Sequence, residues 1–276
     1  MPDSTPENLL GSTARWTAAV RARETAREDR LIHDPWASLL AGKEGEAWIA
    51  QRPPDSTLPI VLRTRFFDDF LQRITTQQGI HQVVLMAAGL DTRAFRLDWP
   101  AETQIFELDQ APVLEYKEQA LRSAGAGARC ARQTIPADLT SPWQEHLIAA
   151  GFNREQPSAW LLEGFLFYLP SETVVHVLDE VSHMATPASW LGFDIINNAM
   201  LNSPYTKAWI EMQAQSGAPW IGVLDTPEEF LAARGWKVTL TQAGQPDAHH
   251  GRWTLPVMPT RMPNMPHNWF VTAQKG

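Results

Sequence analysis

The sequence predicts an α/β protein built on one seven-stranded, mostly parallel sheet with helices on both faces. From residue 82 onward, short apolar runs alternate with helix-like segments, which is the pattern of a doubly wound sheet. Several runs are almost continuously apolar, as expected for parallel strands that are buried on both faces. The first 80 residues are instead helical in composition and period. We therefore expect an N-terminal helical cap or lid, residues 1–80, followed by a sheet domain, residues 81–276.

Apolar runs bounded by turns define the predicted strands. They cover residues 83–89, 104–109, 132–139, 159–167, 190–196, 236–242 and 268–274. Helical patterns separate most of them, at residues 111–124, 142–150, 171–185 and 227–234. No convincing helix separates the last two strands, so we expect the final strand to be antiparallel.

Three helices are expected ahead of the sheet. Residues 12–30 are rich in Ala, Arg and Glu, and a second helix is predicted to begin with Asp34 as N-cap and Pro35 at its first position. The third, residues 61–79, has a clear 3.6-residue apolar period. Arg63 lies at the margin of its apolar face, whereas Arg65 lies nearer the polar side. If one of these arginines points into a cavity, it is therefore expected to be Arg63.

Bulk composition excludes several classes of protein. A formal net charge of −8 and the lack of a basic stripe argue against a nucleic-acid partner. No run is long and apolar enough for a membrane helix, and the polar residues 1–10 do not resemble a signal peptide. Cys130 is the single cysteine and fits a reducing compartment. A cytoplasmic protein is the resulting expectation.

The turn after the first predicted strand is the main candidate for a ligand site. The small residues Ala87 and Gly89 let the backbone approach a ligand closely. Asp109 follows 20 residues later at the end of the second strand, where a carboxylate is suited to a ribose diol. This combination favours a nucleotide cofactor in general. The dinucleotide fingerprint of three glycines and the P-loop Lys-Ser/Thr are both missing.

Two later strand ends carry further polar candidates. Asp138 and Leu139 follow the third strand, where the carboxylate could accept an adenine amino group while the leucine packs on the ring. An N-cap role for Asp138 is the alternative, although Ser141-Pro142 offers a better cap. Glu163 stands inside an apolar run, so its carboxylate must be paired or face a cavity. The sulfonium and amino groups of S-adenosylmethionine would suit it.

Several segments, in this order, resemble the leucine carboxyl methyltransferase family, and most closely its bacterial, polyketide-tailoring branch. They read Ala-Ala-Gly-Leu-Asp-Thr-Arg from Ala87, Phe-Glu-Leu-Asp to Asp109, Ala-Asp-Leu to Leu139, and Leu-Leu-Glu-Gly-Phe-Leu-Phe-Tyr-Leu around Glu163. The upstream blocks Arg-Thr-Arg-Phe-Phe-Asp-Asp-Phe and His-Asp-Pro-Trp resemble that branch too. The resemblance covers roughly residues 12–200, and residues 197–276 follow it only in outline.

The resemblance implies a Rossmann-like class I methyltransferase with S-adenosyl-L-methionine as cofactor. Arg63 would bind the cofactor carboxylate, with Arg23 as a second candidate. Ala87 and Gly89 would line the cofactor turn, Asp109 would hold the ribose, Asp138 and Leu139 the adenine, and Glu163 the methionine end. The sequence departs from the family at Ala87, where Gly is typical.

The expected reaction is O-methylation of a carboxylate on a small, aromatic polyketide-like acid. A carboxylate is ionised at pH 7 and needs no base, whereas a phenol with a pKa of about 10 would benefit from one. Phenolic O-methylation and methylation of a protein carboxylate remain alternatives. A nicotinamide-dependent oxidoreductase and a cofactor-binding protein without activity are candidates from other classes. No Cys, His or carboxylate spacing predicts a metal site, and no catalytic residue is assigned.

Two long segments, residues 197–223 and 244–267, are predicted as insertions that cover the cleft. The first contains Tyr205, Trp209 and Trp220, and the second holds five prolines where a tight hairpin would suffice. We expect them to give an apolar pocket for a flat acceptor. Core packing or a homodimer contact is the alternative reading.

Overall fold

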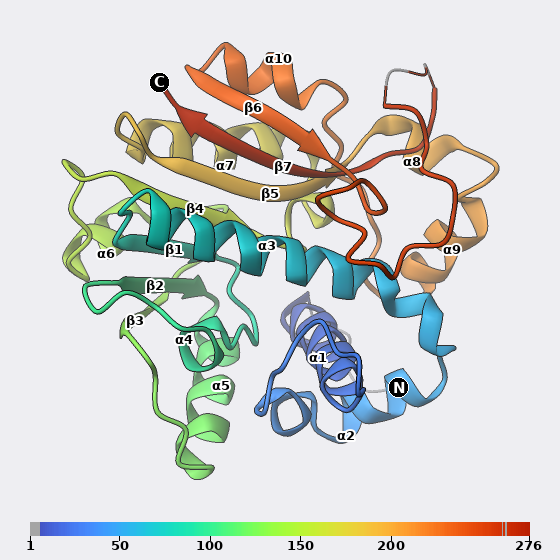
Figure 1. The fold of residues 1–276 in the computed structure, drawn as a ribbon, viewed down its shortest axis with the longest axis horizontal. Helices are drawn as coiled ribbons and strands as arrows, with labels where there is room; N and C mark the ends of the chain where they lie inside the picture. The colour runs from blue at the N-terminus through green and yellow to red at the C-terminus, as the bar shows by residue number, and fades with distance from the viewer. Residues whose placement is uncertain (1–5, 261, 263) are drawn as a thin grey trace.

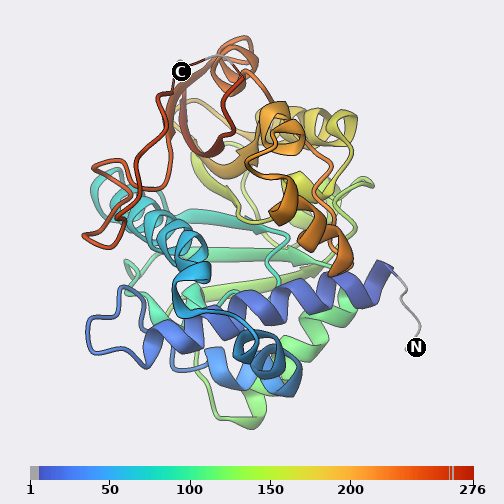
Figure 2. The same ribbon diagram turned by 90° about the vertical axis from the view of Figure 1, so that its right-hand side faces the viewer.

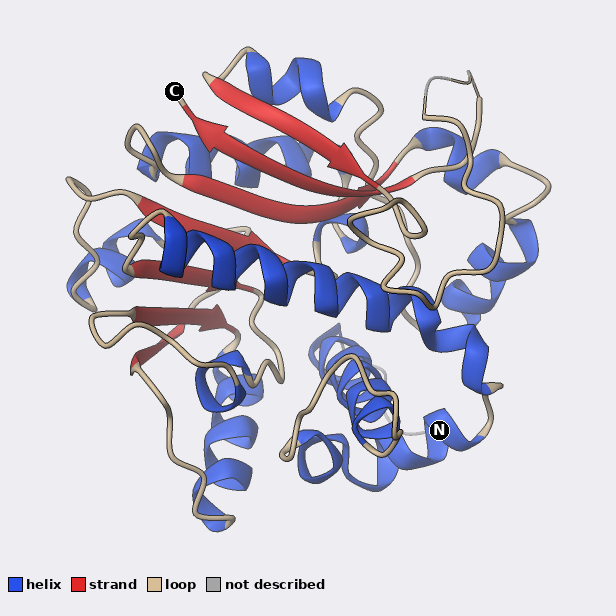
Figure 3. Ribbon diagram, in the orientation of Figure 1, coloured by secondary structure: helices blue, strands red, loops and turns tan. Residues whose placement is uncertain are grey.

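A single mixed sheet organises the molecule. The computed structural model describes residues 6–260, 262 and 264–276, so the first five residues of the polar N-terminal segment lie outside the described part. The strand order is β3-β2-β1-β4-β5-β7-β6. The first five strands pair in parallel, and β7 is antiparallel to both of its neighbours (Figures 1 and 3). The predicted sheet and its antiparallel final strand are therefore confirmed.

The strands lie within two residues of their predicted starts. Their bounds are β1 Gln82–Met86, β2 Gln104–Asp109, β3 Ala131–Pro136, β4 Ser158–Leu162, β5 Trp190–Ile196, β6 Trp236–Thr241 and β7 Asn268–Lys275. The helices are α1 Pro6–Thr25, α2 Ala37–Ala50, η1 Pro54–Thr57, α3 Leu58–Gln77, α4 Arg93–Arg96, α5 Ala111–Ser123, α6 Gln144–Ala149, η2 Leu166–Tyr168, α7 Ser171–Met184, α8 Asn198–Asn202, α9 Lys207–Gln215 and α10 Pro227–Ala232.

Apolar residues cover both faces of the sheet, as the near-continuous runs predicted. Successive strand residues point to opposite faces, so Val83 and Val84 enter different cores. Val83 packs in the cluster that contains Phe67 and Leu71 of α3, and Val84 packs in the cluster that contains Val177 of α7. The helix α3 thus covers one face of the sheet, and α7 covers the other (Figure 1).

Three strands, β1, β3 and β4, end at least three residues earlier than predicted, and β3 ends at Pro136 rather than at residue 139. The first ends at Met86 because the chain turns sharply at Ala87 and Gly89, whose φ angles are 51° and 47°. The fourth ends at Leu162, because Gly164 has a φ of 69° and the apolar residues after it form η2. Glu163 therefore stands just after a strand rather than within one.

The expected cap of the second helix is wrong. The helix α2 begins at Ala37, and its N-cap Trp36 makes no side-chain cap bond. Asp34 is buried instead, where its carboxylate accepts hydrogen bonds from Arg21 Nε at 2.8 Å and Thr92 Oγ1 at 2.6 Å. Its Oδ1 also accepts from the backbone N–H of Trp36 at 3.1 Å, so Asp34 joins α1 and the residue before α4 to the turn that precedes α2.

The carboxyl ends of the parallel strands face the side where α1, α8, α9 and the connection between β6 and β7 lie (Figure 1). Figure 2 looks onto this side, which is bordered by α1, α3, the α8–α9 segment and the connection between β6 and β7. Among the described residues, every helix is too short or too polar to cross a membrane.

Candidate functional site

A cavity of about 1250 Å³ opens at the carboxyl ends of β1 to β4. Ligands of open α/β sheets bind at this edge of the sheet. The volume exceeds the range of roughly 300–1,000 Å³ that is usual for one small ligand, so the cavity has room for a cofactor and an acceptor. Of the predicted site residues, the cavity wall includes Arg63, Ala87, Gly89, Asp109, Asp138, Leu139 and Glu163.

The turn after β1 is tied directly to Asp109. The backbone N–H of Gly89 donates to Asp109 Oδ2 at 2.6 Å, and the N–H of Gln110 donates to Oδ1 at 2.7 Å. Burial raises the pKa of Asp109, although these two backbone donors act to lower it. A carboxylate has about four lone-pair sites, so two remain for a ligand. Asp109 can therefore hold a diol while it fixes the turn.

Asp138 and Leu139 lie together on the wall beyond β3. Leu139 is buried, whereas the Asp138 side chain is exposed at the cavity edge. The Asp138 carboxylate accepts hydrogen bonds from Thr140 N at 2.9 Å and Thr140 Oγ1 at 2.7 Å, and these bonds lower its pKa. Asp138 thus closes a local turn that presents Leu139 to the cavity.

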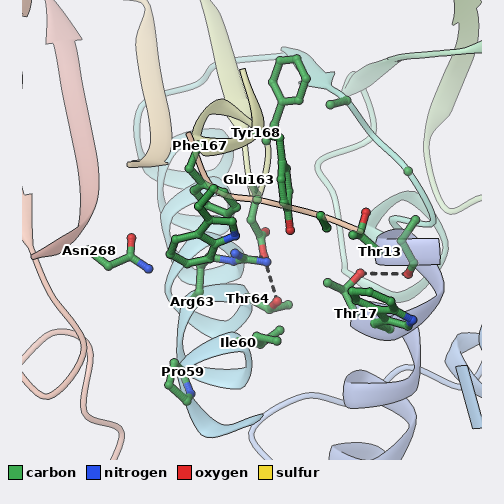
Figure 4. Close-up of a pocket in the computed structure, with 18 of the residues that line it drawn as sticks. Thr13, Thr17, Pro59, Ile60, Arg63, Thr64, Glu163, Phe167, Tyr168 and Asn268 are labelled. Atoms are coloured by element: carbon green, nitrogen blue, oxygen red, sulfur yellow. Dashed lines mark hydrogen bonds and ion pairs between the residues drawn. The ribbon is translucent and has the colours of Figure 1, made fainter. Parts of the chain in front are cut away.

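Glu163 is the centre of a group of ion pairs at the base of the cavity. Its Oε1 accepts from Arg63 Nε at 3.1 Å and Thr64 Oγ1 at 2.8 Å, and its Oε2 accepts from Arg93 Nη2 at 2.6 Å. Burial acts to raise the pKa of Glu163, but Arg93 and Arg63 outweigh it and the pKa is lowered. Glu163 therefore stays ionised beside the cavity (Figure 4).

The whole group of ion pairs carries a net negative charge. Through shared salt bridges it contains three arginines and four carboxylates, a charge of −1 when all are ionised. Its members are Arg63, Arg93, Arg96, Asp68, Asp91, Glu163 and Asp194. A buried, uncompensated negative charge is costly unless a cation binds nearby, so this end of the cavity suits a positively charged ligand.

Arg63 lies where a ligand carboxylate could reach it. Its Nη1 donates to Asp194 Oδ2 at 2.9 Å and its Nε to Glu163, which together hold the guanidinium at the wall. Its Nη2 makes no hydrogen bond to another described residue. The Cβ atom of any larger residue at position 164 would lie 2.9 Å from this Nη2. Gly164 therefore leaves room for Arg63, and one donor edge remains for a ligand.

The structure does not place Arg23 with the other predicted residues. Its guanidinium donates to the main-chain oxygens of Ile49 and Arg52 at the end of α2, outside the main cavity. The Ile49 oxygen also accepts from the backbone N–H of Arg52 at 3.2 Å, so Arg23 binds a turn that the main chain already closes. Arg21, one helical half-turn earlier, lines the cavity instead, and it is paired with Asp34.

Several residues at the site were not identified from the sequence. Arg93 pairs with Asp68, Asp91 and Glu163, and Asp194 pairs with Arg63. Asp194 is a carboxylate within the apolar run of β5. A carboxylate in an apolar run is the signal that pointed to Glu163, so the same signal would also point to Asp194. Asp68 gave no such signal, because a carboxylate in the sequence of an amphipathic helix is ordinary.

The part of the cavity beyond Glu163 is aromatic. Phe167 packs against Tyr168 with ring centroids 4.7 Å apart and against Trp220 at 4.1 Å, and Trp220 packs against Trp209 at 4.2 Å. Figure 4 shows the Tyr168 side chain pointing into the space between α3 and the α1 residues Thr13 and Thr17. Burial raises the pKa of Tyr168, so its hydroxyl is a neutral hydrogen-bond group near neutral pH.

The titratable side chains in the cavity wall are unevenly distributed. The carboxylates among the described wall residues are Asp91, Asp109, Asp138 and Glu163, all at the strand ends, and no histidine lies in that set. The described part of the chain also contains no group of three or more His, Cys, Asp or Glu residues arranged for a metal ion. The aromatic residues thus add no carboxylate to the wall.

Comparisons with known proteins agree with this geometry. Residues 14–182 match the model of the family described as leucine carboxyl methyltransferase. A protein of Parafrankia sp. is 41% identical over 96% of this chain and 87% of its own, and one of Mycolicibacterium smegmatis is 35% identical over 88% of each chain. Both are named as S-adenosyl-L-methionine-dependent methyltransferases.

A solved structure extends the likeness to the whole fold. The methyltransferase from Thermobifida fusca superposes with a TM-score of 0.53 over 94% of each chain, at 17% sequence identity. At that identity the likeness concerns the fold alone, and the arrangement of the site comes from the residues described above.

Proposed function

Because this chain belongs to the leucine carboxyl methyltransferase family and is an S-adenosylmethionine-dependent methyltransferase, we propose that it methylates a carboxylate oxygen of a small, flat, polyketide-like acid. One observation carries the acceptor class. The carboxylates of the described cavity wall lie at the strand ends, whereas the aromatic residues Phe167, Tyr168, Trp209 and Trp220 add none to the wall. An anionic acceptor on this wall would contact none of those carboxylates, and its flat body would fit the aromatic rings.

The proposed cofactor position follows the order of the strand ends. Asp109 would accept from the ribose hydroxyls, and Leu139 with Asp138 would border the adenine. The amino group and sulfonium would face the Glu163 group of ion pairs, whose net charge of −1 favours a cation. The donor edge of Arg63 would bind the methionine carboxylate. Ala87 and Gly89 would let the backbone pass close to the ligand.

S-adenosylmethionine, when bound, would supply an electrophilic methyl group. The acceptor carboxylate oxygen would form the new C–O bond in line with the C–S bond that breaks, and S-adenosylhomocysteine would be left. The protein contributes positioning and a dry cavity, which in favourable cases lower a barrier by about 7–11 kcal/mol. The aromatic residues Phe167, Trp209 and Trp220 would hold the acceptor and exclude water. Tyr168 would donate a hydrogen bond to the acceptor oxygen that is not methylated.

A phenolic acceptor is the alternative on the same fold, and a protein carboxylate is another. A phenol with a pKa of about 10 would need a group to take its proton. Glu163 is unsuited to that task because its arginine partners lower its pKa. The carboxylate acceptor requires no proton transfer and therefore fits these residues better.

The test measures methyl transfer from radiolabelled S-adenosylmethionine to aromatic acids and to phenols of matched shape. We expect label in a product that mild base converts to methanol, as an ester requires, and no label in the base-stable ethers of the phenols. Asp109→Ala should abolish the signal and weaken cofactor binding in calorimetry, whereas NAD should not bind. Labelled ethers without esters would overturn the carboxylate assignment and favour phenolic transfer.

A further inference from the structure

Arg52 lines the cavity at the end of α2, away from the strand ends. Its guanidinium carbon lies 3.6 Å from the centre of the Trp48 ring, and its Nη1 donates to the Trp48 main-chain oxygen at 3.2 Å. Its own main-chain oxygen accepts from Arg23 Nη1 at 3.1 Å. Trp48 therefore holds the guanidinium and Arg23 holds the Arg52 main chain, and the remaining guanidinium donors have no acceptor among the described residues.

This arginine differs from the others in the described cavity wall. Arg21, Arg63, Arg93 and Arg96 each form a salt bridge with at least one buried or nearly buried carboxylate. Arg52 forms none with any described residue, and its one recorded acceptor is a neutral carbonyl. Burial lowers the pKa of Arg52, whereas carboxylate partners raise the pKa values of Arg63 and Arg93. A fixed, uncompensated guanidinium favours binding of an anion from solution.

Flat and apolar residues form one side of the surroundings of Arg52. Trp16 stacks on Trp48 with ring centroids 5.1 Å apart and planes 11° from parallel, and Ile60 packs against the same small apolar cluster as Trp48. A ligand whose anionic group binds Arg52 would therefore place a flat, apolar part against these rings. The proposed cofactor position does not supply this anion, since its carboxylate binds the donor edge of Arg63 beside the Glu163 group.

The anion bound by Arg52 is also distinct from the oxygen that is methylated. An arginine on the reacting carboxylate would reduce its nucleophilicity, and it would lose its charged partner when the neutral ester forms. A guanidinium that binds a second carboxylate keeps that partner before and after transfer. It positions the acceptor without weakening the nucleophile.

We propose that Arg52 binds a second carboxylate of the acceptor, so that the preferred substrates are flat aromatic dicarboxylic acids of which one carboxylate is methylated. This inference rests on the proposed function, since it assigns the other end of the same acceptor. Arg52 is then a specificity-determining residue for dianionic over monoanionic acids.

The test is calorimetry on the full chain loaded with S-adenosylhomocysteine, so that no methyl transfer is needed. The probes form two pairs, each of a monocarboxylate and the dicarboxylate of the same ring system. The first pair is benzoate with benzene-1,4-dicarboxylate, and the second is 2-naphthoate with naphthalene-2,6-dicarboxylate. We expect at least one dicarboxylate to bind about tenfold more tightly than its monocarboxylate, as one charge-assisted hydrogen-bonded contact would give. Arg52→Gln should remove this preference, and Arg52→Lys should keep part of it.

Controls separate this role from a general loss of binding. Arg154→Gln removes an exposed arginine outside the cavity and should behave as the wild type. S-adenosylmethionine should bind all variants within about twofold, because Arg52 is assigned to the acceptor. The proposal is overturned if the wild type shows no dicarboxylate preference, if Arg52→Gln retains it, or if Arg52→Gln weakens cofactor binding. Failure of the proposed function would appear separately, as absence of methyl ester from a protein that binds its cofactor.

Discussion

Ala87 holds a backbone conformation that costs an alanine free energy. Its φ of 51° lies in the left-handed region, where a Cβ atom meets the following carbonyl at a cost of roughly 1–2 kcal/mol. We expect Ala87→Gly to raise the free energy of unfolding by up to about 1 kcal/mol, because relief of strain exceeds the added entropy of the unfolded chain. Denaturant unfolding followed by circular dichroism measures the change.

The neighbouring residue supplies the matched control. Ala88 is buried and is not among the residues with positive φ. Ala88→Gly therefore relieves no strain, removes a packed methyl group and raises the conformational entropy of the unfolded chain. That variant should lower the free energy of unfolding by about 1 kcal/mol or more. Equal destabilisation by the two substitutions would show that the turn holds no strain at Ala87.

At the residue scale, the sequence points to a site where the polarity of a side chain conflicts with its surroundings. Glu163 is such a residue, because a carboxylate inside an apolar run needs partners, and in the structure its partners are Arg63, Arg93 and Thr64. Arg23 could not be excluded in this way, since an arginine in a helical stretch fits many environments. In the structure, Arg23 donates to main-chain oxygens at the end of α2, outside the main cavity. The roles of these residues toward the cofactor remain proposals.

At the scale of elements, a buried lysine joins β2 to α5. Lys117 Nζ lies 2.7 Å from Glu107 Oε2, and both side chains are fully buried. Arg132 of β3 binds the same oxygen at 2.6 Å. Lys117→Met should lower the free energy of unfolding by about 3 kcal/mol, because the buried carboxylate loses a partner.

The same substitution at an exposed lysine isolates the effect of burial. Lys207 on α9 lies 3.9 Å from Glu211, and both side chains are largely exposed. Lys207→Met should change stability by less than about 0.5 kcal/mol. If the two variants unfold at the same denaturant concentration, then Arg132 alone compensates Glu107 and the β2–α5 ion pair adds little.

Elements were predicted well and their ends less well, for a physical reason. Burial on both faces makes the strands apolar throughout, so their existence is visible in the sequence. The run after β4 stays apolar past Leu162, yet the chain leaves the strand at Gly164 and forms η2. Burial of η2 residues such as Leu166 looks the same in the sequence as burial in a strand.

At the scale of the whole molecule, the position of the site follows from the topology. Parallel strands bring their carboxyl ends to one edge, so Gly89, Asp109, Asp138 and Glu163 were expected to converge, and all of them line one cavity. The other walls could not be predicted, because they depend on how distant segments pack. Arg52 and Trp48 enter the cavity only through the arrangement of α1, α2 and α3.

The segment that joins β6 to β7 closes part of this cavity. Trp253, Val257 and Met258 line it, while Leu255 is 64% exposed and Met262 is 49% exposed. Arg252 fastens the segment to the end of α1 and the loop after it, through Glu24 at 3.0 Å and Asp29 at 3.2 Å. Exposed apolar side chains on a segment held by ion pairs fit a cover over an acceptor better than core packing does.

Replacement of residues 246–264 by a short Gly/Ser linker tests that role. The cofactor contacts proposed here lie on other elements, so S-adenosylmethionine should bind with unchanged affinity while methyl transfer is lost. Arg252→Ala should give a milder version, with a several-fold higher KM for the acid and no change in cofactor affinity. Its difference from the wild type should shrink at high salt, which screens the ion pairs. Unchanged turnover in the linker variant would exclude a cover, and a changed oligomeric state would assign the segment to a subunit contact instead.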